Sequence, residues 1–448
     1  GITDSCTLVV LPVLAKLGYS VAKYSTKNIG ASFGTLDRLS VFEGYKPTIS
    51  IKKFYQVIKK VGISIIGENE NIMPADKLIY KYRELTGTVP SIPLIACSIM
   101  AKKVVMGAKT VVLDVKCGEG SLLKNTLQAE KLAKMMVEIG KLAGMRITAI
   151  ISNLNQPLGM TIGPMLEVKE ALELLKGDNI DEKSDLYKMC EEMVAHIMVS
   201  SGDAKSRDVA KDRFREVIRS GEAFEKLKEM VASHGGKTTK FDDLELLVPK
   251  VNSFYIASDK SGFLYDINLK GLYQAVNVIG ANANGTINRN VGVELLAREG
   301  DKVIKGDKLA KVYADFRKYM DAKYHHIVDM VEQAYNQQKS KAQIDKTPRV
   351  VSTPKHNNRQ AEERKAQQRD KQLNKYQSIA PVVVTDTNGK PQSICAKINE
   401  QYYYVSLDAK EPRFWALNMR GATPMTDEQF LSFFTYSVES AKAGDIVI

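Results

Sequence analysis

The fold of this 448-residue chain is decided by the run TVVLDV (Thr110–Val115), the segment TLQAEKLAKMMVEIGKLA (Thr126–Ala143) and the run RITAIIS (Arg146–Ser152). The two runs are short and rich in β-branched residues, as strands are, whereas the longer segment has the apolar spacing of a helix. Strands separated by helices of about ten or more residues are typical of an α/β layer with a mainly parallel sheet. In such sheets, ligands bind beyond the carboxyl ends of the strands.

The same alternation extends over residues 1–250. We expect a further strand at Ser64–Ile66. We expect further helices at Thr7–Leu17, Ser50–Val61, Ala75–Leu85, Ser91–Met106, Leu166–Leu175 and Asp181–Ser200. The fold class is therefore α/β, with a mixed, mostly parallel sheet and flanking helices.

The pattern changes after residue 250. Short strands are expected at Phe254–Ala257, Gly262–Ile267 and Gly292–Ala297, before the turn-rich run GDKVIKGD (Gly300–Asp307). This stretch resembles the barrel-sandwich module of biotinyl and lipoyl carriers. A carrier displays a lysine on a tight hairpin between small residues or Met, and no such lysine is present, so we expect a structural β module.

Residues 379–448 predict a separate small α+β domain. Pro381–Thr385 and Ser393–Ile398 flank Asn388-Gly389, which favours a type I′ hairpin turn because both turn residues tolerate positive φ. Gln401–Leu407 is expected to form a third strand, and TDEQ (Thr426–Gln429) is a capping box before a helix that ends near Ala443. No chemistry can be assigned to this domain.

Composition excludes several classes of protein. Hydrophobic residues make up 44% of the chain and charged residues 26%, which is ordinary for a globular protein. The apolar run Leu8–Leu14 is far shorter than the roughly 20 residues that span a bilayer. The 5 cysteines lack a CxxC pair and the 5 histidines lack metal-binding spacing, so we expect reduced thiols in the cytoplasm and no metal site.

The net charge of +12 is concentrated in one segment. Lys339–Tyr376 carries 11 Lys or Arg against 4 acidic residues and few large apolar side chains. Such a segment buries too little surface to offset the entropy of ordering, so we expect a disordered basic linker over residues 339–378. The alternative is a tether for nucleic acid or another anionic surface, although only Tyr376 could stack on a base there.

Two stretches carry candidate chemistry. STKNIGASFGTLD (Ser25–Asp37) mixes glycines, hydroxyls and a lysine, and the backbone N–H groups of such a turn can converge on an anion. Ser98 and Lys102 are four residues apart on one expected helix and share a face, toward which Arg83 could fold back. Together they could bind a planar polar group or stabilise negative charge. An ordinary Ser/Gly loop and a solvated helix face remain the alternatives.

These stretches closely resemble the pyrimidine-nucleoside phosphorylase and thymidine phosphorylase family, over roughly residues 1–352. The motifs that carry the resemblance are PADK (Pro74–Lys77), SIPLI (Ser91–Ile95), SIMAKK (Ser98–Lys103), GTLD (Gly34–Asp37), LDVKCGEG (Leu113–Gly120), SNLNQPLG (Ser152–Gly159) and EVKEA (Glu167–Ala171).

The resemblance implies phosphorolysis of thymidine or uridine to free base and pentose 1-phosphate in nucleoside salvage, by a homodimer that needs no cofactor besides phosphate as co-substrate. It places pyrimidine binding on Arg83, Ser98 and Lys102, with Arg83 and Lys102 catalytic. It places phosphate binding on Thr7, Ser25 and Thr35. It also divides the chain into a phosphate-side α/β domain (1–74 and 106–250), a helical-lobe segment (75–105) and a β-rich module (251–352).

The sequence departs from the family pattern in two places. The family's Lys-His-Ser-Thr-Gly run, which contacts phosphate and pyrimidine, would precede Gly1, and Phe33 replaces a glycine that lets backbone approach an anion. We therefore expect either a piece of a longer active enzyme or a diverged member with little activity. A catalytically silent scaffold, whose linker and C-terminal domain bind a partner, is the alternative function. A Mg²⁺-dependent phosphoribosyltransferase ranks last, because no acidic pair follows a strand.

Overall fold

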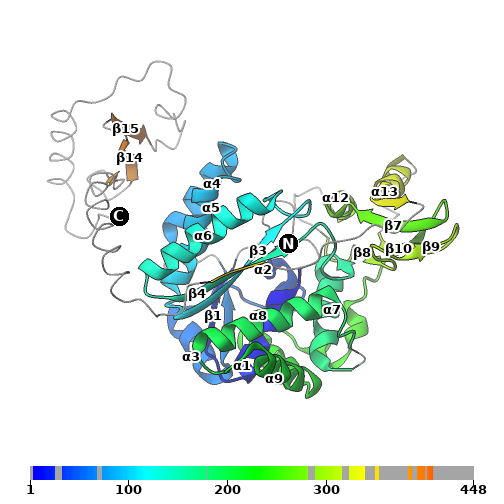
Figure 1. Ribbon diagram of the computed structural model, residues 1–448, viewed down its shortest axis with the longest axis horizontal. Helices are drawn as coiled ribbons and strands as arrows, with labels where there is room; N and C mark the ends of the chain where they lie inside the picture. Colours follow the sequence, from blue (N-terminus) through cyan, green and yellow to red (C-terminus); the bar gives the residue numbers. More distant parts are fainter. Residues whose placement is uncertain are drawn as a thin grey trace. The chain divides into compact units, whose positions relative to one another are not determined.

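The computed structural model describes residues 4–25, 33–67, 73–178, 180–280, 288–314, 322–338, 349–352, 382–385, 391–398 and 401–406. Residues 1–353 and residues 354–448 form separate compact units, each described by itself. Figure 1 shows the first unit as a layer of helices and parallel strands followed by a β-rich module.

The helices of the first unit alternate with its first strands. They are α1 (Cys6–Lys16), α2 (Thr35–Leu39), α3 (Ile51–Val61), α4 (Pro74–Leu85), α5 (Ile92–Val105), α6 (Thr126–Leu142), α7 (Pro164–Lys176), α8 (Asp185–Ser201), α9 (Arg207–Arg219), α10 (Glu222–Ser233), α11 (Thr239–Asp242), a 3₁₀ turn (Leu244–Leu247), α12 (Leu269–Gly280) and α13 (Ala322–Gln333). The helices expected up to residue 200 are confirmed within a few residues, whereas α9, α10 and α12 were not foreseen.

Local chemistry explains where these helices begin and end. The Ser50 side chain accepts the Lys53 backbone N–H at 3.2 Å before α3, and Ser184 does the same for Tyr187 before α8. Gly62 follows α3 with a φ of 92°, a left-handed conformation that only glycine adopts without strain.

Two parallel strand pairs form the α/β layer. The first pair is β1 (Val21–Tyr24) with β2 (Ile63–Ile66), and the second is β3 (Thr110–Cys117) with β4 (Arg146–Asn153). In the second pair, Thr110 lies opposite Arg146, so the strands run in step for their whole length. The expected α/β class with parallel strands and flanking helices is confirmed (Figure 1).

The strand β12 (Arg349–Ser352) pairs antiparallel with β4. It falls within residues 339–378, which were expected to form a disordered linker. These four residues correct that expectation, and the rest of the linker lies outside the described residues. A short β-branched run, Val350-Val351, completes the exposed edge of β4 because unpaired strand edges favour further pairing.

The helix α5 shares a core with β3, β4 and α6. Its buried residues Ile95, Ala96 and Met100 join the cluster that contains Leu113 and Ile147. The expected boundary at residue 105, between a helical-lobe segment and the α/β domain, therefore does not separate two cores.

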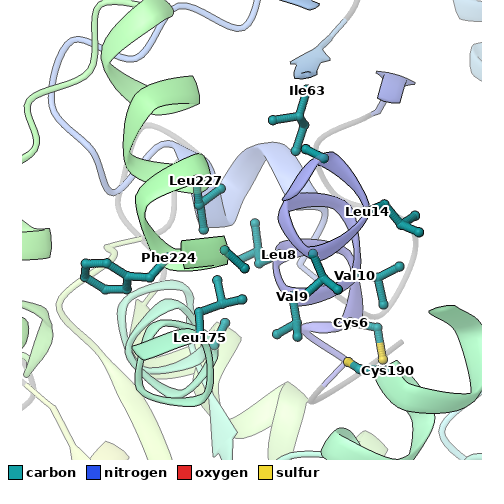
Figure 2. Close-up of a cluster of buried hydrophobic side chains, with 14 of the residues drawn as sticks. Cys6, Leu8, Val9, Val10, Leu14, Ile63, Leu175, Cys190, Phe224 and Leu227 are labelled. Atoms are coloured by element: carbon teal, nitrogen blue, oxygen red, sulfur yellow. The ribbon is translucent and has the colours of Figure 1, made fainter. Parts of the chain in front are cut away.

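The helix α1 is the centre of the largest core. Figure 2 shows its side chains Leu8 and Val9 facing Leu175 of α7 and Leu227 of α10. The apolar run that is too short for a membrane thus forms a buried helix. Among the described residues, no helix is both long and apolar enough to cross a bilayer. The burial of Leu8 and Val9 holds the amino end of α1 in place.

The β-rich module contains two antiparallel sheets. One has the order β5-β8-β10-β6 and the other the order β11-β7-β9. The strands are β5 (Thr161–Ile162), β6 (Ser253–Ala257), β7 (Gly262–Ile267), β8 (Gly292–Leu295), β9 (Lys302–Val303), β10 (Lys308–Tyr313) and β11 (Tyr335–Gln338). The expected strands are confirmed, and α12 and α13 complete the module's core.

The second unit contains the expected hairpin. The strands β13 (Val382–Thr385), β14 (Pro391–Ile398) and β15 (Gln401–Ser406) form an antiparallel sheet in chain order. The Asn388-Gly389 turn and the helix expected after Thr426 lie outside the described residues.

Candidate active site

The side chains of Ser98 and Lys102 meet on one face of α5, as their spacing predicts. Lys102 Nζ donates to Ser98 Oγ at 3.0 Å, and Ser98 Oγ donates to Asp76 Oδ1 of α4 at 2.9 Å. Lys102 Nζ also forms an ion pair with Asp76 Oδ2 at 2.9 Å, with both side chains about 15% exposed. The result is a closed triangle of an ammonium, a hydroxyl and a carboxylate.

Asp76 is the member of this triangle that sequence reasoning gave no role. It lies in the first turn of α4, where a negative charge also favours the helix amino end. Its position inside the quoted PADK motif was the available signal. Its effect is to fix the Lys102 ammonium and the Ser98 hydroxyl in one orientation.

Arg83 lies at the end of α4 and holds the connection to α5. Its Nη2 donates to the carbonyl oxygen of Val89 at 2.6 Å and its Nη1 donates to that of Leu94 at 3.3 Å. The guanidinium also lies 5.3 Å from the centre of the Tyr80 ring. No hydrogen bond joins Arg83 to Ser98 or Lys102 in the described part of the chain. Its Nε is buried and has no hydrogen-bond partner among the described residues.

One of the expected phosphate residues follows the carboxyl end of β1, and the other two lie at the starts of helices. Thr7 is in the first turn of α1, Ser25 directly follows β1, and Thr35 is the first residue of α2. Ser25 and Thr35 are each 8% exposed. Residues 26–32, which connect them, are not described.

Lys23 of β1 lies beside the expected phosphate residues, although sequence reasoning assigned it no role. Its Nζ donates to Thr7 Oγ1 at 3.1 Å. Lys23 and Ser25 are two residues apart and therefore share a face of an extended chain, which was the signal in the sequence. Burial lowers the pKa of Lys23, although Asp4 nearby opposes that effect. A cation, a hydroxyl and a helix amino end therefore lie together, which is a suitable setting for an anion.

A buried charge network supports the amino end of α1. Lys116 Nζ lies 2.5 Å from Asp114 Oδ2 and 3.8 Å from Asp4 Oδ2. Burial alone would lower the pKa of Lys116, but the two carboxylates hold it above its ordinary value. Ser152 Oγ of β4 donates to Asp114 at 2.5 Å. The network ties α1 to the carboxyl ends of β3 and β4.

Phe33 stands where the family pattern has a glycine, and its side chain is buried in the structure. Its ring is 4% exposed and packs edge-to-face against Tyr273 of α12, with 5.2 Å between the ring centres. It belongs to the core of the β-rich module.

In the described residues, no group of three or more His, Cys, Asp or Glu is placed to hold a metal ion.

Comparisons with known proteins agree on the family. The profile of the glycosyl transferase family, a/b domain, matches residues 3–224. Pyrimidine-nucleoside phosphorylase of Bacillus subtilis (strain 168) is 36% identical over 318 residues, which cover 70% of this chain and 73% of that protein. The pyrimidine-nucleoside phosphorylase of Geobacillus stearothermophilus is 36% identical over 326 residues, covering 72% and 75%. The chain belongs to the pyrimidine-nucleoside phosphorylase family.

Membership of the pyrimidine-nucleoside phosphorylase family confirms the resemblance drawn from the motifs, and every candidate residue from Thr7 to Lys102 lies within residues 3–224. Among solved structures, anthranilate phosphoribosyltransferase from Thermus thermophilus is 18% identical, with a TM-score of 0.41, covering 52% of this chain and 74% of that one. That similarity is too distant to bear on the assignment.

Proposed function

We propose that this phosphorylase-family chain is a pentosyltransferase that cleaves pyrimidine nucleosides with phosphate, giving free base and pentose 1-phosphate in nucleoside salvage. The observation that carries the proposal is the triangle of Asp76, Ser98 and Lys102, present in a chain of this family. A hydroxyl and an oriented ammonium are suited to the polar edge of a pyrimidine ring. Arg83 adds a cation on the same helix pair, where its Nη1 donates to the carbonyl oxygen of Leu94, one turn before Ser98.

The chemistry follows from where charge develops. The bond between the pentose carbon and the ring nitrogen breaks, and its electron pair stays with the base. Lys102 and Arg83 stabilise the resulting negative charge, while an oxygen of the phosphate dianion bonds to the pentose carbon. The base anion then takes up the proton that the phosphate group releases as the pentose 1-phosphate becomes a dianion. Orientation and electrostatics carry most of the rate, so phosphate is the only co-reactant and no other cofactor is needed.

Phosphate is held by Thr7, Ser25 and Thr35 together with Lys23. The Lys23–Thr7 hydrogen bond and the amino end of α1 support this subsite. The pyrimidine and phosphate residues lie on different elements, and we propose that a closing movement of these elements brings the co-substrates together. We further propose a cytoplasmic homodimer, in keeping with the resemblance and with free thiols at Cys6, Cys97, Cys117 and Cys190. A nucleic-acid contact through the basic linker rests on charge alone.

Release of free base from thymidine or uridine in the presence of phosphate tests the function on the product of the complete coding sequence. We expect Lys102→Met and Asp76→Asn to lower kcat/KM by roughly 10- to 100-fold, because each removes one charge-assisted contact. Glu216→Gln, at an exposed position on α9, is the matched control and should be unchanged.

Asp76→Asn separates positioning from structure. The amide keeps an acceptor for Ser98 but loses the ion pair with Lys102. We therefore expect kcat to fall while the urea midpoint of unfolding stays close to the wild-type value. If the wild-type chain releases no base, the silent scaffold is favoured. Wild-type rates in both variants would refute the assigned roles.

A further inference from the structure

Lys103 is a charged residue to which the mechanism above gives no role. It follows Lys102 on α5 and is partly buried. Its helix packs toward β1, because Ala101 and Met106 contact the small core cluster around Tyr24 and Ile66. Lys23 of β1 and Lys102 of α5 are the charged groups that act on Lys103. Three ammonium groups therefore gather where β1 meets α5.

Two of these three ammonium groups have partners, and the third has none among the residues described. Lys23 donates to Thr7, and Lys102 pairs with Asp76. Among the residues that the structure describes, the side-chain ammonium of Lys103 forms no hydrogen bond or ion pair, whereas its backbone carbonyl accepts from the Ala108 N–H.

The carboxylates that act on the two neighbouring lysines, Asp76 on Lys102 and Asp4 on Lys23, have other partners as well. The carboxylate of Asp76 contacts Lys102 and Ser98, and Asp4 lies beside Lys116. Arg38, which adds positive charge near Lys23, is paired with Glu167. Within the described ranges, the ammonium of Lys103 therefore has no carboxylate partner.

Burial and the neighbouring ammonium groups change the protonation of Lys103. Burial, with smaller contributions from Lys23 and Lys102, lowers the pKa of Lys103 to about 7. Near neutral pH the side chain is therefore divided between amine and ammonium. A bound dianion favours the ammonium and raises this pKa.

We propose that Lys103 is an anion-binding residue of this site, and that its counter-ion is the phosphate dianion held by Lys23 and Thr7. The inference rests on the proposed function, because it adds a cation to the same phosphate subsite. Its consequence is that the protein takes up a proton when the dianion binds. Affinity is therefore highest below the pKa of the free side chain and falls as pH rises through it.

Isothermal titration calorimetry of the full chain with sulfate tests this coupling. Sulfate remains a dianion throughout the neutral range, so any proton uptake belongs to the protein rather than to the ligand. We expect the dissociation constant to rise about tenfold between about pH 6 and pH 8. Titrations in buffers of different ionisation enthalpy should show an uptake of about half a proton near pH 7.

Two substitutions separate the charge from its titration. Lys103→Arg keeps a cation that does not lose its proton, so sulfate should still bind while the pH dependence and the proton uptake disappear. Lys103→Met should weaken binding about tenfold at about pH 6, where the wild-type side chain is charged. Lys141→Met, at an exposed lysine near the end of α6, is the control and should bind as the wild type does.

Three results overturn the inference: no binding of sulfate, a wild-type affinity independent of pH, or unchanged binding by Lys103→Met. If the wild type nevertheless releases free base with phosphate, Lys103 loses its role and the proposed function survives. If no base is released, the proposed function itself fails.

Discussion

Replacing Arg38 with Met would leave the carboxylate of Glu167 buried without its cation. Arg38 of α2 and Glu167 of α7 have side chains that are 6% and 1% exposed. Arg38 Nε donates to Glu167 Oε2 at 2.5 Å, and the backbone N–H of Gly163 donates to Oε1 at 3.1 Å. This pair joins the short helix that carries Thr35 to the main core.

The size of the effect follows from this burial. Removing one partner of a buried ion pair costs about 3–5 kcal/mol, because the remaining charge is neither solvated nor compensated. The double variant Arg38→Met/Glu167→Leu removes both charges and leaves only the Gly163 N–H unpaired, which costs roughly 1–3 kcal/mol. We therefore expect the double variant to be more stable than Arg38→Met alone.

Urea unfolding of the full chain, followed by far-ultraviolet circular dichroism, measures these free energies. The matched control is Arg219→Met, which breaks the exposed pair with Glu182, where the side chains are 61% and 44% exposed. We expect the control to lose less than about 1 kcal/mol. The reasoning is refuted if Arg38→Met loses no more than the control, or if the double variant is less stable than the single one.

Two further predictions concern the half-buried Glu170 of α7 and the buried Phe33. Burial raises the pKa of Glu170 from 4.5 to about 7. Because the pKa in the folded protein exceeds that in the unfolded chain, the free energy of unfolding of the wild type should fall by roughly 1–3 kcal/mol as pH rises from about 4.5 to about 7. Glu170→Gln should remove this pH dependence. Equal pH slopes of the unfolding free energy in the wild type and the variant would contradict this. Phe33→Ala should cost roughly 3–4 kcal/mol, because its ring is 4% exposed and packs on Tyr273; a loss below about 1 kcal/mol in urea unfolding would mean that the ring is not part of the core.

Features that depend on neighbouring residues were predictable. The runs at Thr110–Val115 and Arg146–Ser152 form the parallel strands β3 and β4, because a strand's pattern is visible in a few residues. Ser98 and Lys102 share a face of α5 because four residues make about one helical turn. The family motifs were equally local, which is why the assignment survives comparison with known proteins.

Features that depend on distant contacts were not predictable. The pairing of Arg349–Ser352 with β4 joins residues about 200 apart in a segment whose composition favours disorder. The partner of Lys102 is Asp76 on another helix, and the ring of Phe33 is accommodated by Tyr273.

The sequence alone determined the class of fold, the family and the kinds of side chain available for chemistry, because these reside in local patterns and contiguous motifs. Only the tertiary structure decided which charges are paired and which are not: Lys102 with Asp76, Lys23 with Thr7, and Lys103 with no described partner. The physical reason is that burial and electrostatic pairing depend on distances in space, which the order of residues along the chain does not specify.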